Sequence, residues 1–329
     1  MKILRKLKLF GIIFISSLVA TGCISMKVNL TDYTDPLKEV TLEGKGNNKV
    51  AVIPINGHIS DKEEEGMMRR KPSLVKEVVS QIRKAENDPG VKAIVLKINS
   101  SGGSVTASDM LYNEIKKLKE KTNIPVVVSM MDIATSGGYY VSLPADHIVA
   151  HQTTITGSVG VVFIRPKFQG LMDKIGVGVE TSQSGVSKDM GSPFRPTTVG
   201  EEKSFQIIID EMADIFESKV RQHRNLSDAA MEEVMMAKVY TAKQALAIGL
   251  IDEIGYTETA ISKAKSMAGL EEDARVIMYR RVEFADDNIY NDISAHSATG
   301  SSLVNLGALS QLSDIKAGFY YTWPAVTTN

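Results

Sequence analysis

The stretch VKAIVLKINSSGGSV, Val91–Val105, decides the fold of this chain. Its first part is rich in β-branched and aliphatic residues and predicts a buried strand, while the double glycine predicts a tight loop. A helical segment follows at about Ser108–Lys121, and IPVVVSMM, Ile124–Met131, predicts the next strand. Strands that alternate with helices through short glycine-containing joins predict an α/β fold with a largely parallel sheet.

The same alternation extends to both sides of this stretch. Upstream, KVAVIPING from Lys49 predicts a buried strand, and Ser73 is placed to cap a helix that ends near Glu86. Downstream, DHIVAH and TITGSVGVVF predict short strands, and Val177–Gly185 predicts one more. We therefore expect one enzyme-sized domain.

The second half of the chain is expected to be mainly helical. Thr198 and Glu201 are spaced as a capping box before a long predicted helix. Thr241 and Gln244 are spaced as a second capping box before a short one. From about residue 288 the chain is rich in serine, asparagine and alanine, and it ends in the aromatic cluster GFYYTWPAV. Residues 288–329 are therefore expected to form a flexible C-terminal tail.

The composition is that of an ordinary globular protein. Of the 329 residues, 43% are hydrophobic and 23% are charged, and the formal net charge is −1. Because the chain has no basic stripe, we expect no nucleic-acid partner.

The N-terminus carries the features of an export signal. The basic start MKILRKLK precedes an apolar run, Leu9–Ala20, which is short for a membrane span. The run closes in LVATGC, whose Cys23 is the only cysteine, and this ending resembles a bacterial lipoprotein processing site. We expect a signal peptide over 1–23, a lipidated Cys23, a tether over 24–48, and a domain anchored on the extracytoplasmic side of a membrane. An uncleaved signal anchor is the alternative.

The stretch DIATSGGYYV places Ser136 between a small residue and two glycines, at a predicted strand-to-helix junction. A substrate backbone can approach a serine in such a setting, and the unpaired amides of a helix start favour a nearby oxyanion. A helix N-cap is the alternative interpretation, because serine is common there. In the same way, the amides of Gly102 and Gly103 could point at an oxygen, or the pair could be a simple turn.

A nucleophilic serine needs a base, and the residues alone do not identify one. None of the five histidines lies in a convincing setting; they are His58, His147, His151, His223 and His296. A lysine can replace histidine if its surroundings make the neutral form accessible. Lys188, in SGVSKDMGSPFRP, is one of many lysines that this argument allows.

Four blocks of the sequence together resemble the bacterial signal peptide peptidase family. They are INSSGGSV, ATSGGYYVSLPADHIVAHQTTITGSVGV, SGVSKDMGSPFRP and VYTAKQALAIGLIDEIG, and the resemblance covers roughly Lys49–Leu270. It implies a serine–lysine protease with a fold related to ClpP and crotonase, a repeated β-β-α superhelix. On this basis residues 49–287 form the catalytic domain.

The resemblance also implies roles for individual residues. Ser136 matches the family's nucleophile, and Lys188 matches its general base. Ser158, in TGSVG, matches a hydroxyl that orients the lysine. Gly103 is expected to supply one oxyanion amide, and Gly137 is our assignment for the second. The chain departs from the family pattern in the glycine loop, where a serine replaces the usual proline, and before Tyr240, where Ala-Lys replaces Gly-Arg.

The expected activity is peptide hydrolysis by acyl transfer, which needs no metal or other cofactor. The expected substrates are cleaved signal peptides and other short apolar peptides. The short members of the family form rings in which serine and lysine meet across a subunit interface, so the resemblance implies a homo-oligomer. The alternatives are a crotonase-type acyl-CoA enzyme, a non-catalytic lipid-anchored scaffold, and a protease of misfolded membrane-protein fragments.

Overall fold

A computed structural model describes residues 35–65, 70–281, 284, 287–291 and 317–323 of the chain. The predicted signal peptide 1–23 with Cys23, the first part of the tether, and most of the predicted tail lie outside these residues. None of the described helices is long and apolar enough to cross a membrane.

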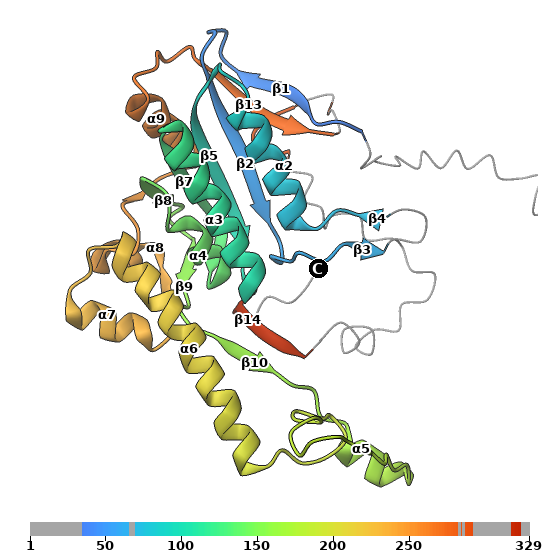
Figure 1. The fold of residues 1–329 in the computed structure, drawn as a ribbon. Coiled ribbons are helices and arrows are strands. Elements are labelled where there is room, and N and C mark those ends of the chain that lie inside the picture. The colour runs from blue at the N-terminus through green and yellow to red at the C-terminus, as the bar shows by residue number, and fades with distance from the viewer. Residues whose placement is uncertain (1–34, 66–69, 282–283, 285–286, 292–316, 324–329) are drawn as a thin grey trace, which may run out of the picture. The chain divides into compact units, whose positions relative to one another are not determined.

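A nine-stranded sheet forms the centre of the fold (Figure 1). Its strands are β1 (Lys38–Glu43), β2 (Lys49–Asn56), β5 (Val91–Ser100), β7 (Val126–Thr135), β8 (His147–Ala150), β9 (Ile155–Gly157), β11 (Val239–Thr241), β12 (Glu253–Ile254) and β13 (Arg275–Arg280). The order along its main path is β1-β13-β2-β5-β7-β8-β12, and only the β1–β13 and β9–β11 pairs are antiparallel. The predicted α/β fold with a largely parallel sheet is confirmed.

Two smaller sheets accompany the large one. The first has the order β10-β14-β6, and the second joins β3 to β4. Their strands are β3 (Glu64–Glu65), β4 (Arg70–Lys71), β6 (Gly102–Ser104), β10 (Val162–Ile164) and β14 (Gly318–Thr322). Part of the predicted glycine loop is therefore a strand, and the region predicted as a tail supplies its partner.

Helices cover both faces of the large sheet (Figure 1). They are α2 (Leu74–Glu86), α3 (Val105–Thr122), α4 (Gly137–Ser142), α5 (Gln169–Ile175), α6 (Val199–His223), α7 (Asp228–Met235), α8 (Ala242–Ile248) and α9 (Thr257–Met267). Along β2, Ala51 and Ile53 join the core that holds α2 and α3, whereas Val50 and Val52 join the core that holds α9. This alternation follows from the two-residue period of a strand that is buried on both faces.

The predicted helix starts are confirmed by their side-chain hydrogen bonds. Ser73 caps α2 by accepting a bond from the amide of Lys76. Both predicted capping boxes are present, at the starts of α6 and α8. These signals are local, so sequence alone identifies them well.

The strand predicted at Val177–Gly185 is wrong. The segment has no regular structure after α5, and its apolar residues Val177 and Val179 are about half exposed. A segment whose residues have high strand propensity becomes a strand only where another strand offers an edge for pairing. Within the described residues, nothing pairs with this segment.

Ala237 gives a test of backbone strain. Its φ of 54° lies in the left-handed region, which costs a residue with a side chain roughly 1–2 kcal/mol. The greater freedom of glycine in the unfolded chain offsets about 0.5–1 kcal/mol of this. We expect Ala237→Gly to raise the unfolding temperature by about 1–4 °C in a thermal scan.

The matched control is Gly249→Ala, at the end of α8, where φ is 86°. This substitution adds a side chain to a left-handed residue and is expected to lower the unfolding temperature. If both substitutions lower it equally, the strain assigned to Ala237 is incorrect.

Candidate active site

Ser136 lies at the sharp turn between β7 and α4. Its φ of 52° and ψ of −115° are rare for any residue with a side chain and cost about 1–3 kcal/mol. The residue is 1% exposed, and its Oγ has no hydrogen-bond partner among the described residues. A buried hydroxyl without a hydrogen-bond partner needs an explanation, and a strained strand-to-helix turn is a position where serine nucleophiles occur.

Ser136 occupies the N-cap position of α4, but its side chain does not cap the helix. The side-chain caps of the other helices have extended backbone, with φ between −62° and −79°, and each accepts a bond from an amide three residues later; they are Ser73, Ser104, Thr198, Ser227 and Thr241. Ser136 precedes a helix as they do but makes no such bond. Within the part of the chain that the structure describes, the Ser136 hydroxyl is therefore not used to hold the fold together.

The two glycines after Ser136 are required by close packing. A Cβ on Gly137 would lie 2.5 Å from the Oγ of Ser108, and a Cβ on Gly138 would lie 2.5 Å from the carbonyl oxygen of Ser100. Since real Cβ atoms do not approach oxygen this closely, only glycine lets α4 begin against β5 and α3.

The glycine loop packs against the residue that follows Ser136. The amide of Ile59 donates to the carbonyl of Gly102, and the amide of Ser104 donates to the carbonyl of Ile59, each at 2.9 Å. Because backbone groups alternate between the two edges of a strand, the N–H of Gly103 points to the other edge. A Cβ on Gly102 would lie 2.7 Å from the amide nitrogen of Gly137, so the loop touches the residue after the serine.

Ser158 lies beside Ser136 because their strands are paired. Thr135 of β7 is registered with Gly157 of β9, and the amide of Ser136 donates to the carbonyl of Gly157 at 2.7 Å. Ser158 is largely buried and also has a positive φ, 53°. The structure thus brings together four of the predicted site residues, the two serines and the two glycines.

Lys188 is not brought to Ser136 within one copy of the chain. It lies in an exposed turn between α5 and α6, and the Ser136 hydroxyl has no partner among the described residues. Figure 1 shows α5 and its flanking segments at the N-terminal end of α6, away from the large sheet.

An ion-pair network fixes the turn that carries Lys188. Arg195 donates to Asp189 at 2.7 Å and to Glu201, in the first turn of α6, at 3.0 Å. Hydrogen bonds from Arg195 and from the amide of Thr198 lower the pKa of Glu201 to about 2, and Arg195 also lowers the pKa of Asp189. Sequence analysis identified Glu201 only as part of a capping box. The signal that could have indicated the ion pairs is the position of Arg195, six residues from both Asp189 and Glu201.

Two of the described histidines are engaged elsewhere. The Nε2 of His147 lies 3.0 Å from Glu253, and the Nε2 of His223 lies 2.7 Å from the hydroxyl of Tyr112. His296 lies outside the described residues. No described histidine makes a hydrogen bond with the candidate nucleophile.

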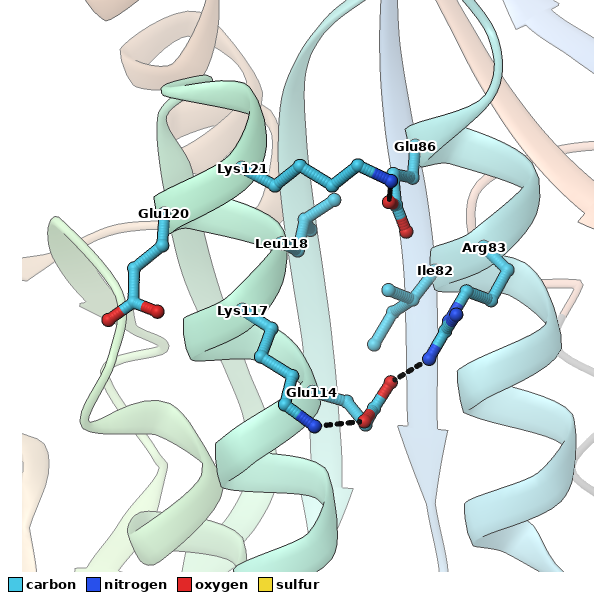
Figure 2. Close-up of a pocket in the computed structure, with 8 residues that line it drawn as sticks. All are labelled: Ile82, Arg83, Glu86, Glu114, Lys117, Leu118, Glu120 and Lys121. Carbon is cyan, nitrogen blue, oxygen red and sulfur yellow. Dashed lines mark hydrogen bonds and ion pairs between the residues drawn. The ribbon is translucent and has the colours of Figure 1, made fainter.

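A groove between α2 and α3 is separate from this site (Figure 2). Its apolar floor is Ile82 and Leu118, and its rim is Arg83, Glu86, Glu114, Lys117, Glu120 and Lys121. Figure 2 shows Glu114 between Arg83 and Lys117, with ion pairs to both. The groove contains none of the predicted site residues, and most of its charges neutralise one another.

The sequence of residues 118–271 matches peptidase family S49. A candidate signal peptide peptidase of Enterococcus faecium is 32% identical over 295 residues, which cover 88% of this chain and 85% of that protein. The chain belongs to peptidase family S49. It is therefore a serine protease, and its resemblance to the signal peptide peptidases is confirmed.

Other relatives of this S49 protease are named as proteases too. A candidate protease of Methanocaldococcus jannaschii is 35% identical over 227 residues, 68% of this chain and 72% of that protein. Protease 4 of Haemophilus influenzae is 34% identical over 270 residues, which cover 80% of this chain but 42% of that longer protein.

Two solved structures are also similar to parts of this chain. The 1510-N membrane-bound stomatin-specific protease is 18% identical, covers 73% of this chain and 96% of its own, and gives a TM-score of 0.42. ClpP1 of Listeria monocytogenes is 19% identical, covers 64% and 94%, and gives 0.40.

Arg195→Met is expected to release the turn that carries Lys188. Loss of both ion pairs should speed hydrogen–deuterium exchange over residues 186–192, because these pairs tie the turn to α6. Since the pKa of Glu201 is lowered, its pairing is fully present above the ordinary glutamate pKa of 4.5 and is lost as the pH falls toward about 2. The difference in exchange protection over residues 186–192 between wild type and Arg195→Met should therefore be constant from pH 5 to 8.

The matched control is Arg165→Met, which removes an ion pair with the exposed Glu202 of the same helix. This variant should leave exchange over 186–192 unchanged. Equal effects of the two substitutions would contradict the anchoring role of Arg195.

Proposed function

We propose that the chain is a membrane-associated serine endopeptidase in which Ser136 is the nucleophile and Lys188 is the general base. The Ser136 hydroxyl carries this proposal, because it is buried, makes no bond with a described residue, and is held on a strained turn beside Gly137. A fold keeps such a hydroxyl only at a cost, and catalysis is the use that explains the cost. A neutral lysine can accept its proton.

The proposed reaction is acyl transfer in two stages. Lys188 accepts the proton of Ser136 as the Oγ bonds to the substrate carbonyl carbon, and the amides of Gly103 and Gly137 stabilise the oxyanion. The C–N bond then breaks, and the lysine protonates the leaving amine. Water attacks the acyl-enzyme with the same lysine as base, which releases the acid and restores the serine.

The segment that carries Lys188 has the surface of a subunit interface. No residue of α5 is buried, and large apolar side chains are exposed on and around it; they are Phe168, Leu171, Ile175, Val177, Val179, Val186, Phe194 and Val199. A soluble monomer rarely leaves so many apolar residues uncovered in one segment. We therefore place this surface against a second copy in a homo-oligomeric ring, where Lys188 meets the neighbour's Ser136.

The proposed substrates are cleaved signal peptides and other short apolar peptides. Only an extended chain can bring a carbonyl to a serine that is 1% exposed, and a ring would further exclude folded proteins. The relative in Enterococcus faecium is named as a candidate signal peptide peptidase. In this proposal the domain is exported and held at the membrane through a lipidated Cys23, near the products of signal peptide cleavage.

The proposal is tested by labelling the full-length assembled protein with a fluorophosphonate and mapping the label by mass spectrometry. Label on Ser136 alone is expected. Ser136→Ala and Lys188→Ala should each lower kcat/KM on an apolar peptide by at least about 10³-fold, because nucleophile and base act as a unit.

The matched control is Lys174→Ala, which removes an exposed lysine of the same segment and should leave labelling and activity intact. An assembled oligomer that takes up no label and cuts no peptide would instead support a non-catalytic scaffold.

A further inference from the structure

Helix α6 joins the turn that carries Lys188 to the body of the domain. Two elements flank the segment that holds this turn, β10 before it and α6 after it. Within the described residues β10 has three residues and pairs only with β14, whereas α6 spans 25 residues. Glu201 in the first turn of α6 accepts a hydrogen bond from Arg195, which also holds the Lys188 turn. The position of Lys188 therefore follows the position of α6.

The C-terminal end of α6 is fixed to the rest of the domain by Arg224. The helix ends at this residue, whose backbone is extended. Its guanidinium donates to both carboxylate oxygens of Asp252, at 2.8 and 3.1 Å, and its Nε donates to the carbonyl of Gly249 at 2.9 Å. The Arg224 side chain is 11% exposed. The contact is thus a bidentate and largely buried ion pair.

Asp252 is itself bonded to the large sheet. Its Oδ2 accepts a hydrogen bond from the amide of Ile148 in β8 at 2.8 Å, and its own amide donates to the carbonyl of Ile148 at 2.9 Å. Strand β8 pairs with β7, which leads into Ser136. The ion pair therefore links α6 to the sheet that positions the nucleophile.

The pair with Asp252 supplies an orientation that the apolar packing of α6 does not. Phe216, nearer the middle of the helix, packs on Tyr140 of α4 with ring centroids 4.9 Å apart. Such a contact is non-directional, whereas a bidentate arginine–carboxylate pair fixes the geometry of both partners. A second polar contact supports the same end of the helix, because the Nε2 of His223 lies 2.7 Å from the hydroxyl of Tyr112 in α3.

The length of α6 magnifies a shift at Arg224. With a rise of about 1.5 Å per residue, Glu201 lies about 22 Å from Phe216 along the helix, and Arg224 lies about 12 Å away on the other side. If the helix turns about the Phe216 contact, a shift of about 1 Å at Arg224 becomes about 2 Å at Glu201 and at the turn tied to it. Misplacing a reacting group by about 1 Å can lower a rate about 10²-fold.

We infer that Arg224 is a positioning residue for the general base. Its pair with Asp252 sets the angle of α6 on the sheet, and α6 carries this angle to Lys188 through Glu201 and Arg195. Because Lys188 acts on the serine of a neighbouring copy, Arg224 of one copy sets the geometry of the dyad that is completed on the next. This inference rests on the proposed function.

The test uses Arg224→Met and the milder Arg224→Lys in the full-length protein; a lysine keeps the charge but cannot pair bidentately. Both variants are expected to assemble and to have a lower kcat on an apolar peptide, by at least about tenfold for Arg224→Met. KM should change little, because the lysine transfers a proton and does not hold the substrate. Arg221→Met removes an exposed arginine of the same helix turn and is the matched control, which should keep full activity.

Subunit mixing distinguishes a misplaced lysine from other damage. Each Arg224 variant keeps its serine, and Ser136→Ala supplies an intact α6 with Lys188. Reassembly of these two should therefore restore about a quarter of wild-type activity. Reassembly of an Arg224 variant with Lys188→Ala offers only misplaced or missing lysines, so it should restore none.

The mixture of Ser136→Ala with Lys188→Ala is the reference. If the reference is restored but the Arg224 variants are restored by Lys188→Ala instead of Ser136→Ala, the pair holds the serine and the inference is overturned. It is also overturned if neither mixture is restored, if the variants are fully active, or if they do not assemble. In these cases the proposed function stands. A reference mixture that stays inactive would overturn the proposed dyad and the inference together.

Discussion

The strained turn between β7 and α4 is the constraint on which the site depends. Ser136 keeps its positive φ because the structure fixes the chain on both sides of it: its amide donates to Gly157, and the two following glycines pack against β5 and α3. The aromatic pair that follows then fastens α4, since the hydroxyl of Tyr139 donates to Leu250 and that of Tyr140 donates to Asp109. Ser136, the two glycines and the two buried tyrosines thus act together to hold the serine in its strained conformation.

This turn prepares the serine, but the proposed base is held by a different part of the fold. Lys188 lies in a turn that Arg195 ties to the start of α6, in a segment whose apolar side chains face solvent in a single copy. The positions of Ser136 and Lys188 are therefore fixed by separate parts of the fold. In our account, activation of the serine requires that assembly cover this apolar surface, so that an isolated copy would have an inactive serine.

Sequence analysis predicted the features that depend on local chemistry. The parallel strands, the caps at Ser73 and Thr198, and the motif around Ser136 follow from residue types and spacing. It failed where the outcome depends on distant partners. The segment Val177–Gly185 reads as a strand but has no edge to pair with. Conversely, β14 comes from a region that reads as a tail, and it becomes a strand because β6 and β10 offer two edges. Family resemblance, rather than periodicity, singled out Lys188.

The central claim, that Ser136 of one copy is activated by Lys188 of another, is tested most directly by mixing subunits. Oligomers of Ser136→Ala and Lys188→Ala are dissociated, combined in equal amounts and allowed to reassemble, and peptide hydrolysis is measured. Random assembly pairs an intact serine with a neighbour's intact lysine at about a quarter of the sites, so about a quarter of wild-type activity should return. Reassembled mixed oligomers that remain as inactive as each variant alone would contradict the account.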